Sequence, residues 1–111
     1  FGNINLYLNS GSKKSHYNLD SLFKIIKEKE CGEILVNDID REGTWSGLNH
    51  KLAKTITGHI NIPIIINGGA KNLIDISNVL ETTNISGVGV GNIVVYQKKG
   101  MGVLINYPKL V

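Results

Sequence analysis

The chain has little cysteine and no long hydrophobic run. Its 111 residues contain one cysteine, Cys31, so no internal disulfide can form, and no Cys/His pair has zinc-ligand spacing. A chain of this kind suits a reducing cytosol, so we expect a cytoplasmic protein. No apolar stretch approaches the ~18–20 residues of a membrane helix, and we therefore expect no membrane role.

Basic runs and aromatic residues are also scarce. The formal net charge is +3 with aromatic content of 6%, and the lysines are spread along the chain without interleaved aromatics. Nucleic-acid binding is therefore not expected. A mild positive charge does suit a small anionic substrate.

Glycine, in contrast, is plentiful. There are 13 Gly against 2 Pro, in a chain that is 41% hydrophobic and 19% charged. The balance is that of a soluble globular domain with tight turns and close backbone approaches. A length of 111 residues is enough for one domain at most. Because the chain begins with Phe1 rather than Met, we expect a piece of a longer protein.

Hydrophobic patterning predicts strands that alternate with helices. Strands are expected at residues 33–37, 62–67 and 85–90. Helices are expected after Asn18, at about residues 48–57, and after Asn72, with Gly32 and Gly58 ending the first two. The alternation implies a parallel sheet with right-handed crossovers, either open and doubly wound or part of a closed barrel.

The two ends of the chain are less regular. Residues 5–8 alternate polar and apolar side chains, which predicts a short strand or one arm of a hairpin. Residues 10–15 are polar and contain glycine, so a loop is expected there. Residues 102–108 have the pattern of another short strand, whose place the sequence does not assign.

Two successive strands end in glycine turns. Gly68 and Gly69 follow Asn67 before a helix, and Gly91 and Asn92 follow the next strand. Glycine lets backbone N–H groups approach an anion, and a helix start adds positive potential. Phosphate-binding barrels place a phosphate at such paired turns, so we predict one phosphate site here, although the glycines could simply permit tight turns.

A third strand end carries three carboxylates beside Arg41. Residues 37–44 read Asn-Asp-Ile-Asp-Arg-Glu-Gly-Thr after an apolar strand. Carboxylates at a strand end can orient a polyol or handle protons. The alternative is a loop of capping Asp residues with one Asp–Arg pair. No His lies near and the spacing is not that of a calcium loop, so no metal is expected. His16, His50 and His59 have no paired carboxylate in the sequence and are not expected to be catalytic.

These segments together resemble the cyclase subunit of imidazole glycerol phosphate synthase (HisF). The resemblance spans nearly the whole chain in order and spacing, and residues 39–44 are its most specific part. The other segments that carry it are Ser10 and Gly11 followed by lysines, residues 32–35, residues 62–64 running into residues 68–70, and Gly91 with Asn92.

The resemblance implies a fold and an activity. The fold would be a phosphate-binding (βα)₈ TIM barrel of about 250 residues, of which residues 1–111 would be one half-barrel segment, the C-terminal half, from the loop after strand 5 through strand 8. The parent would be a lyase of histidine biosynthesis. It would use ammonia from a HisH-like glutaminase docked at the amino-terminal face, and it would need no cofactor.

The resemblance also implies roles for individual residues. Phosphate would be bound by Gly68, Gly69, Gly91 and Asn92, and the middle of the substrate by Asn37, Asp40 and Glu42. Ser10 and Gly11 would belong to a loop that closes over the substrate, and Glu33 would match a charged ammonia gate. The family's two catalytic aspartates would precede Phe1, so the 111-residue chain alone is expected to be inactive.

Departures from the family keep two alternatives open. Glu42 and Asn92 replace the more usual Asp and Ser, and residues 103–108 resemble HisF-like proteins associated with surface-polysaccharide or flagellar glycans. The alternative function is therefore amidation of a sugar with the same ammonia delivery. The other alternative is a non-catalytic phosphate-binding or self-associating half barrel, since a half barrel exposes a sheet edge and an apolar inner face.

Overall fold

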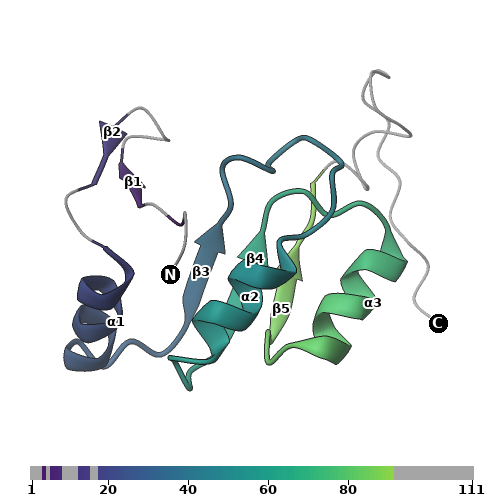
Figure 1. The fold of residues 1–111 in the computed structure, drawn as a ribbon. Helices are drawn as coiled ribbons and strands as arrows, with labels where there is room; N and C mark the ends of the chain where they lie inside the picture. Colours follow the sequence, from purple (N-terminus) through teal and green to yellow (C-terminus); the bar gives the residue numbers. More distant parts are fainter. Residues whose placement is uncertain (1–3, 5, 9–12, 16–17, 92–111) are drawn as a thin grey trace.

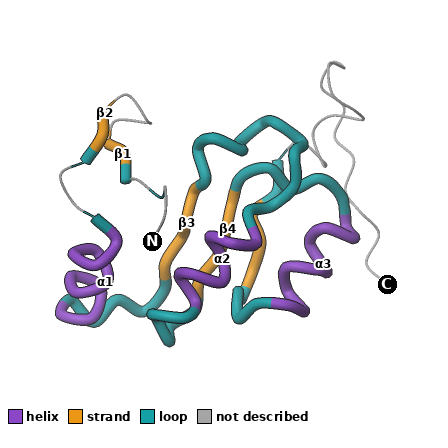
Figure 2. The backbone as a smooth tube through the Cα atoms, in the orientation of Figure 1, coloured by secondary structure: helices purple, strands orange, loops and turns teal. Residues whose placement is uncertain are grey.

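The core of the protein is a three-stranded parallel sheet with helices packed against it (Figure 1). The computed structural model describes residue 4 and residues 6–8, 13–15 and 18–91. The strands are β3 (Ile34–Asn37), β4 (Ile64–Asn67) and β5 (Gly87–Gly89), in the spatial order β3-β4-β5. Figure 2 shows how the first two of these strands each lead through a loop into a helix. The predicted parallel sheet of alternating β and α units is confirmed.

Three helices accompany these strands: α1 (Leu19–Glu28), α2 (His50–Thr57) and α3 (Leu73–Thr82). Each begins after an asparagine whose side-chain oxygen accepts a hydrogen bond from a backbone N–H of the first turn. That N–H has no partner within the helix itself. The caps at Asn18 and Asn72 were predicted. The second helix begins two residues later than predicted, because Asn49 caps it.

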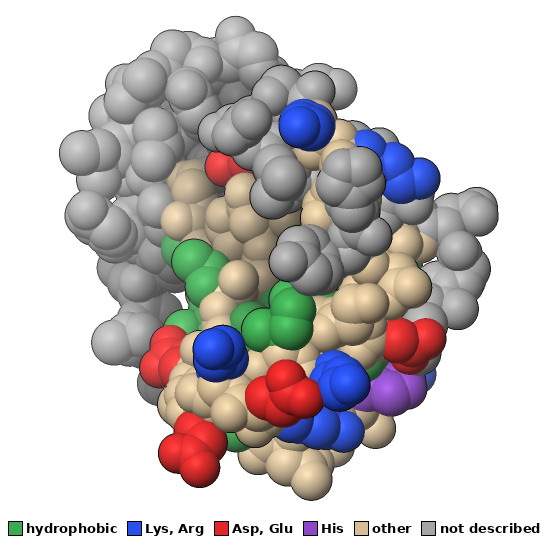
Figure 3. Space-filling view, turned by 90° about the vertical axis from the view of Figure 1, so that its left-hand side faces the viewer, with side chains coloured by type: hydrophobic (Ala, Val, Ile, Leu, Met, Phe, Trp, Pro, Cys, Tyr) green, Lys and Arg blue, Asp and Glu red, His purple; other side chains and the backbone are tan. Residues whose placement is uncertain are grey.

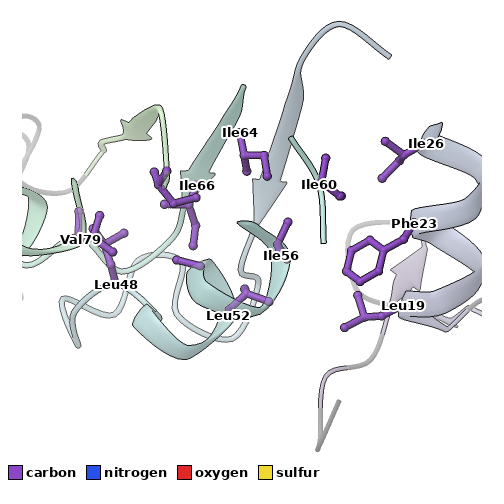
Figure 4. Close-up of a cluster of buried hydrophobic side chains, with 13 residues drawn as sticks. Leu19, Phe23, Ile26, Leu48, Leu52, Ile56, Ile60, Ile64, Ile66 and Val79 are labelled. Carbon is purple, nitrogen blue, oxygen red and sulfur yellow. The ribbon is translucent and has the colours of Figure 1, made fainter. Parts of the chain in front are cut away.

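The helices cover one face of the sheet. Ile64 and Ile66 are each 1% exposed, and Figure 4 shows them beside Leu52 and Ile56 of α2. Alternate residues of a strand point to opposite faces, so Leu35 points the other way, and it is 67% exposed. The sheet therefore has one face buried under helices and one open face.

The remaining strands form a small hairpin. β1 (Tyr7–Leu8) pairs antiparallel with β2 (Lys13–Lys14). The predicted hairpin arm at residues 7–8 is confirmed. The predicted loop at residues 10–15 was wrong at Lys13 and Lys14, since the polar side chains of a solvated strand cannot be told from those of a loop by composition. Both lysines are exposed.

Gly32 does not end the first helix as predicted. The helix stops at Glu28, Lys29 is the C-cap, and Glu30 takes a positive φ of 52°. A left-handed residue after the cap is a common way to end a helix, although glycine is usual there. Residues 27–30 are exposed, as predicted for a solvated face. Figure 3 shows acidic, basic and hydrophobic side chains mixed on the side of the molecule where α1 lies.

No helix of the described residues is long and apolar enough to cross a membrane.

Truncating a side chain should lower the free energy of unfolding more on the buried face of the sheet than on the open face. Ile66→Ala removes a buried side chain beneath the helices and should lower the free energy of unfolding by about 2–5 kcal/mol. Leu35→Ala, on the open face, should change it by less than about 0.5 kcal/mol. Urea unfolding followed by circular dichroism measures both. Equal losses for the two variants would mean that the open face is covered in solution.

Candidate functional site

Parallel pairing brings three polar strand ends to one edge of the sheet. Asn37 of β3, Asn67 of β4 and Gly89 of β5 are register partners. The Asn67 Nδ2 donates to Asn37 Oδ1 at 2.9 Å, and the Asn37 Nδ2 donates to Glu42 Oε2 at 3.2 Å. The side chains of Asn37 and Asn67 lie on the open face, because the intervening Val36 and Ile66 face the helices. The carboxyl edge thus carries one continuous hydrogen-bonded string.

The acidic loop after β3 contains two side chains that hold the loop together and two that are exposed at the site. The Asp38 side chain accepts from the Asp40 backbone N–H at 3.2 Å and from Asn49 Nδ2 at 3.2 Å, and it lies 3.6 Å from Arg41 Nε. Asp38 and Arg41 therefore form the capping and ion pair that was the alternative interpretation. Asp40 and Glu42 remain exposed at the site.

The Gly68–Gly69 turn packs directly against that loop. Both glycines have a positive φ, 117° and 88°. A Cβ on Gly68 would stand 2.5 Å from Asp38 O, and one on Gly69 would stand 2.6 Å from Gly47 O. The Gly47 N–H donates to Gly69 O at 2.8 Å. Backbone contact alone thus requires glycine at both positions, and their phosphate-binding role stays a prediction.

Asp75 is the residue that the sequence analysis missed. Its Oδ2 accepts from the backbone N–H of Leu48 at 2.9 Å and of Lys71 at 3.1 Å, and its Oδ1 lies 3.5 Å from His50 Nε2. Asp75 thereby ties the turn before α3 to the start of α2. Its place three residues after the Asn72 cap is a recognisable helix-start signal, but contacts 25–27 residues away leave no local pattern. His50 therefore has a carboxylate neighbour that was not expected.

The other predicted site residues are spread out. Gly91 is exposed just beyond β5, and a Cβ there would meet no atom of the described residues within 4 Å. Glu33 is exposed immediately before β3, at the opposite end of the sheet. Ser10, Gly11, Asn92 and the segment 97–111 lie outside the described residues.

A separate cleft of about 320 Å³ lies at the amino-terminal end of the sheet. It is lined by the ends of α2 and α3 and by the turns that lead into β4 and β5. The hydroxyls of Thr57, Thr82 and Thr83 all donate to helix carbonyls. The other polar side chains that line the cleft are those of Lys54, Glu81 and Asn84. Within the described ranges, no three His, Cys, Asp or Glu side chains gather as a metal site would need.

Comparison with known proteins assigns the class. Residues 2–100 match the family described as "Histidine biosynthesis protein", and the chain belongs to that family. The family's fold is a (βα)₈ barrel, and the parallel βα units of this chain are consistent with part of one.

The individual relatives are HisF proteins. The chain is 40% identical over 101 residues to "Putative imidazole glycerol phosphate synthase subunit HisF" of Leptospira borgpetersenii, covering 91% of this chain and 40% of that protein. It is 36% identical over 83 residues to the subunit named hisF2 in Pseudomonas aeruginosa, covering 75% and 33%. It is 34% identical over 86 residues to subunit HisF of Lactiplantibacillus plantarum, covering 78% and 34%. The recognition from sequence is confirmed, and the chain spans about two fifths of the length of the first of these relatives.

The close contact between the loop and the glycine turn predicts that adding one methyl group at Gly69 strongly lowers stability. Gly69→Ala should lower the free energy of unfolding by about 1–3 kcal/mol, because it strains a left-handed residue and overlaps Gly47 O. Gly32→Ala is the matched control, since a Cβ there meets nothing within 4 Å. Chemical denaturation gives both values, and a neutral Gly69→Ala would contradict the described packing.

Proposed function

We propose that residues 1–111 are the C-terminal half of a (βα)₈ barrel, with β3, β4 and β5 as its strands 6, 7 and 8. The proposed parent is the cyclase subunit of an imidazole glycerol phosphate synthase. The observation that carries the proposal is the hydrogen-bonded string that joins the ends of β4 and β3 to Glu42 in the loop after β3, since active sites of this fold lie at the carboxyl ends of its strands. Membership of the histidine biosynthesis family supports the choice of reaction.

The open face of the sheet supports a barrel. In a barrel the inner face of each strand is covered by the strands opposite, while helices cover the outside. Leu35 is an exposed apolar side chain on the face away from the helices, and Ile65 is its register partner. Among the described strands, β3 and β5 are the edges of the sheet. The same features favour the alternative of a self-associating half barrel, which would cover that face with a second copy.

Substrate would lie along the carboxyl edge with its phosphate at the glycine end. Carboxylates repel a phosphate, so Asp40 and Glu42 favour a neutral, hydroxylated part of the substrate near Asn37. The phosphate then belongs near Gly91 and the Gly68–Gly69 turn, with Asn92 and the loop of Ser10 and Gly11 as further proposed contacts. The catalytic aspartates of the family are proposed to lie before Phe1.

Ammonia would enter from the opposite end. Glu33 immediately precedes β3, and continuing the alternation of that strand by one residue would place it on the same face as Leu35 and Asn37. A charged group there suits a gate for a small polar molecule entering the barrel. The proposed partner at this end is a HisH-like glutaminase, in a cytoplasmic complex.

A second candidate is amidation of a sugar in surface-polysaccharide or flagellar-glycan biosynthesis. Two relatives, from Pseudomonas aeruginosa and Vibrio vulnificus, are named hisF2 and hisF3, and such numbered family members leave the specific role open. Glu42, in place of the more usual Asp, also extends the carboxylate that would meet the substrate.

If phosphate binds near Gly91, a negative charge introduced at that position should weaken phosphate binding. Gly91→Asp should weaken binding of inorganic phosphate at least about tenfold in isothermal titration, because a carboxylate would stand beside the anion. Gly32→Asp makes the same charge change at the other end of the sheet, where it should have little effect beyond the ~8 Å screening length. Equal weakening by both variants would contradict the placement. Cyclase turnover by the 111-residue chain would contradict the proposal that the catalytic aspartates precede Phe1.

The two candidate reactions differ in a growth test. The longer protein that contains this chain should restore growth of a bacterial histidine auxotroph that lacks the cyclase subunit, when expressed with its own glutaminase. The control is the same protein with Gly69→Asp, which should not restore growth because the close contact with Gly47 forbids a side chain. Failure of the unaltered protein to restore growth would favour sugar amidation.

A further inference from the structure

The hydrogen bonds at the strand ends all run in one direction. Asn67 donates to Asn37, and Asn37 donates to Glu42, so each amide uses its N–H on the next acceptor along the string. No described residue donates to Asn67 Oδ1, which leaves that oxygen as an acceptor at one end. Glu42 ends the other side of the string with an exposed carboxylate.

Gly89 fits this arrangement for a specific steric reason. A Cβ on Gly89 would stand 2.9 Å from Asn67 Oδ1 and 3.1 Å from Asn67 Cβ. Gly89 has no positive φ, so alanine is allowed by its backbone, unlike at Gly68 and Gly69. The three atoms nearest to a Cβ at Gly89 all belong to the Asn67 side chain, which lies over it.

Together these contacts make Asn67 the link between three strands. Its Oδ1 lies against β5 and its Nδ2 bonds to β3, and adjacent strands are about 4.8 Å apart. These contacts therefore span roughly 10 Å across the edge of the sheet. The groups left over are the Asn67 Oδ1 and the Glu42 carboxylate as acceptors and the second N–H of each amide as donors, a set that suits hydroxyls, which both donate and accept. The Glu42 carboxylate disfavours a phosphate beside it.

We propose that Asn67 is a positioning residue that orients Asn37 and Glu42 toward the hydroxyl-bearing segment of a phosphorylated polyol. It fixes the direction in which Asn37 donates, and it leaves acceptors for neutral hydroxyl groups. Gly89 is the residue that gives Asn67 the room to do so. The proposal rests on the proposed phosphate site, because the phosphate would anchor the ligand whose hydroxyls bond to Asn67, Asn37 and Glu42.

A double-mutant cycle on Asn67 and Gly89 tests the proposal. Binding of sn-glycerol 3-phosphate and of inorganic phosphate is measured by isothermal titration for the wild type, Asn67→Ala, Gly89→Ala and the double variant. Each single variant should bind glycerol phosphate about 3–10-fold more weakly, the amount that one or two neutral hydrogen bonds give, and inorganic phosphate unchanged. The double variant should be no weaker than either single one, because the two changes disturb the same contact.

Two controls separate this effect from loss of fold. Asn61→Ala changes an exposed asparagine before the opposite end of β4 and should leave both affinities unchanged. The side-chain NH₂ resonances of Asn37 should move in Asn67→Ala and Gly89→Ala without ligand, and stay in place in Asn61→Ala. Should Asn67→Ala not fold, Asn67→Ser repeats the cycle with a smaller change.

The outcomes distinguish this proposal from the proposed function. If the wild-type chain does not bind inorganic phosphate, the phosphate site and this proposal are both overturned. Normal phosphate binding with an unaltered glycerol phosphate affinity in Asn67→Ala would overturn the positioning role alone. Additive effects of Asn67→Ala and Gly89→Ala would also overturn it.

Discussion

The parallel register of three short strands determines where the candidate site residues at their carboxyl ends lie. Asn37, Asn67 and Gly89 end their strands at the same level, so polar groups more than 20 residues apart in the sequence meet at one edge. The alternation of side chains along each strand then sends Ile64 and Ile66 to the helices and Asn67 to the open face. A slip of one residue in β4 would exchange these faces and remove the site.

Backbone packing and ligand binding are two separate reasons for glycine at the ends of these strands. Gly68 and Gly69 are fixed by contact with Asp38 and Gly47, so their presence does not by itself demonstrate a phosphate site. Gly91 is different, because no contact with a described residue requires glycine there. The most informative position for the phosphate proposal is therefore the exposed glycine beyond β5, rather than the more conspicuous Gly-Gly turn.

Local patterns predicted what depends on local physics. The caps at Asn18 and Asn72 and the apolar strands follow from neighbouring residues, and the family followed from short motifs such as residues 39–44. Asp75 and the Asn37–Asn67 bond could not be predicted, because each joins segments 25–30 residues apart. The strand at Lys13 and Lys14 was missed because a two-residue strand with polar side chains has no periodicity to detect.

Chemical-shift mapping tests the central claim, that substrate binds at the carboxyl edge of β3, β4 and β5. The ¹⁵N-labelled chain is titrated with sn-glycerol 3-phosphate and its amide resonances are followed. The account predicts the largest shifts at Asn37, Asn67, Gly89 and Gly91. Largest shifts instead around Gly58 and Asn84, which line the cleft at the amino-terminal end, would contradict it.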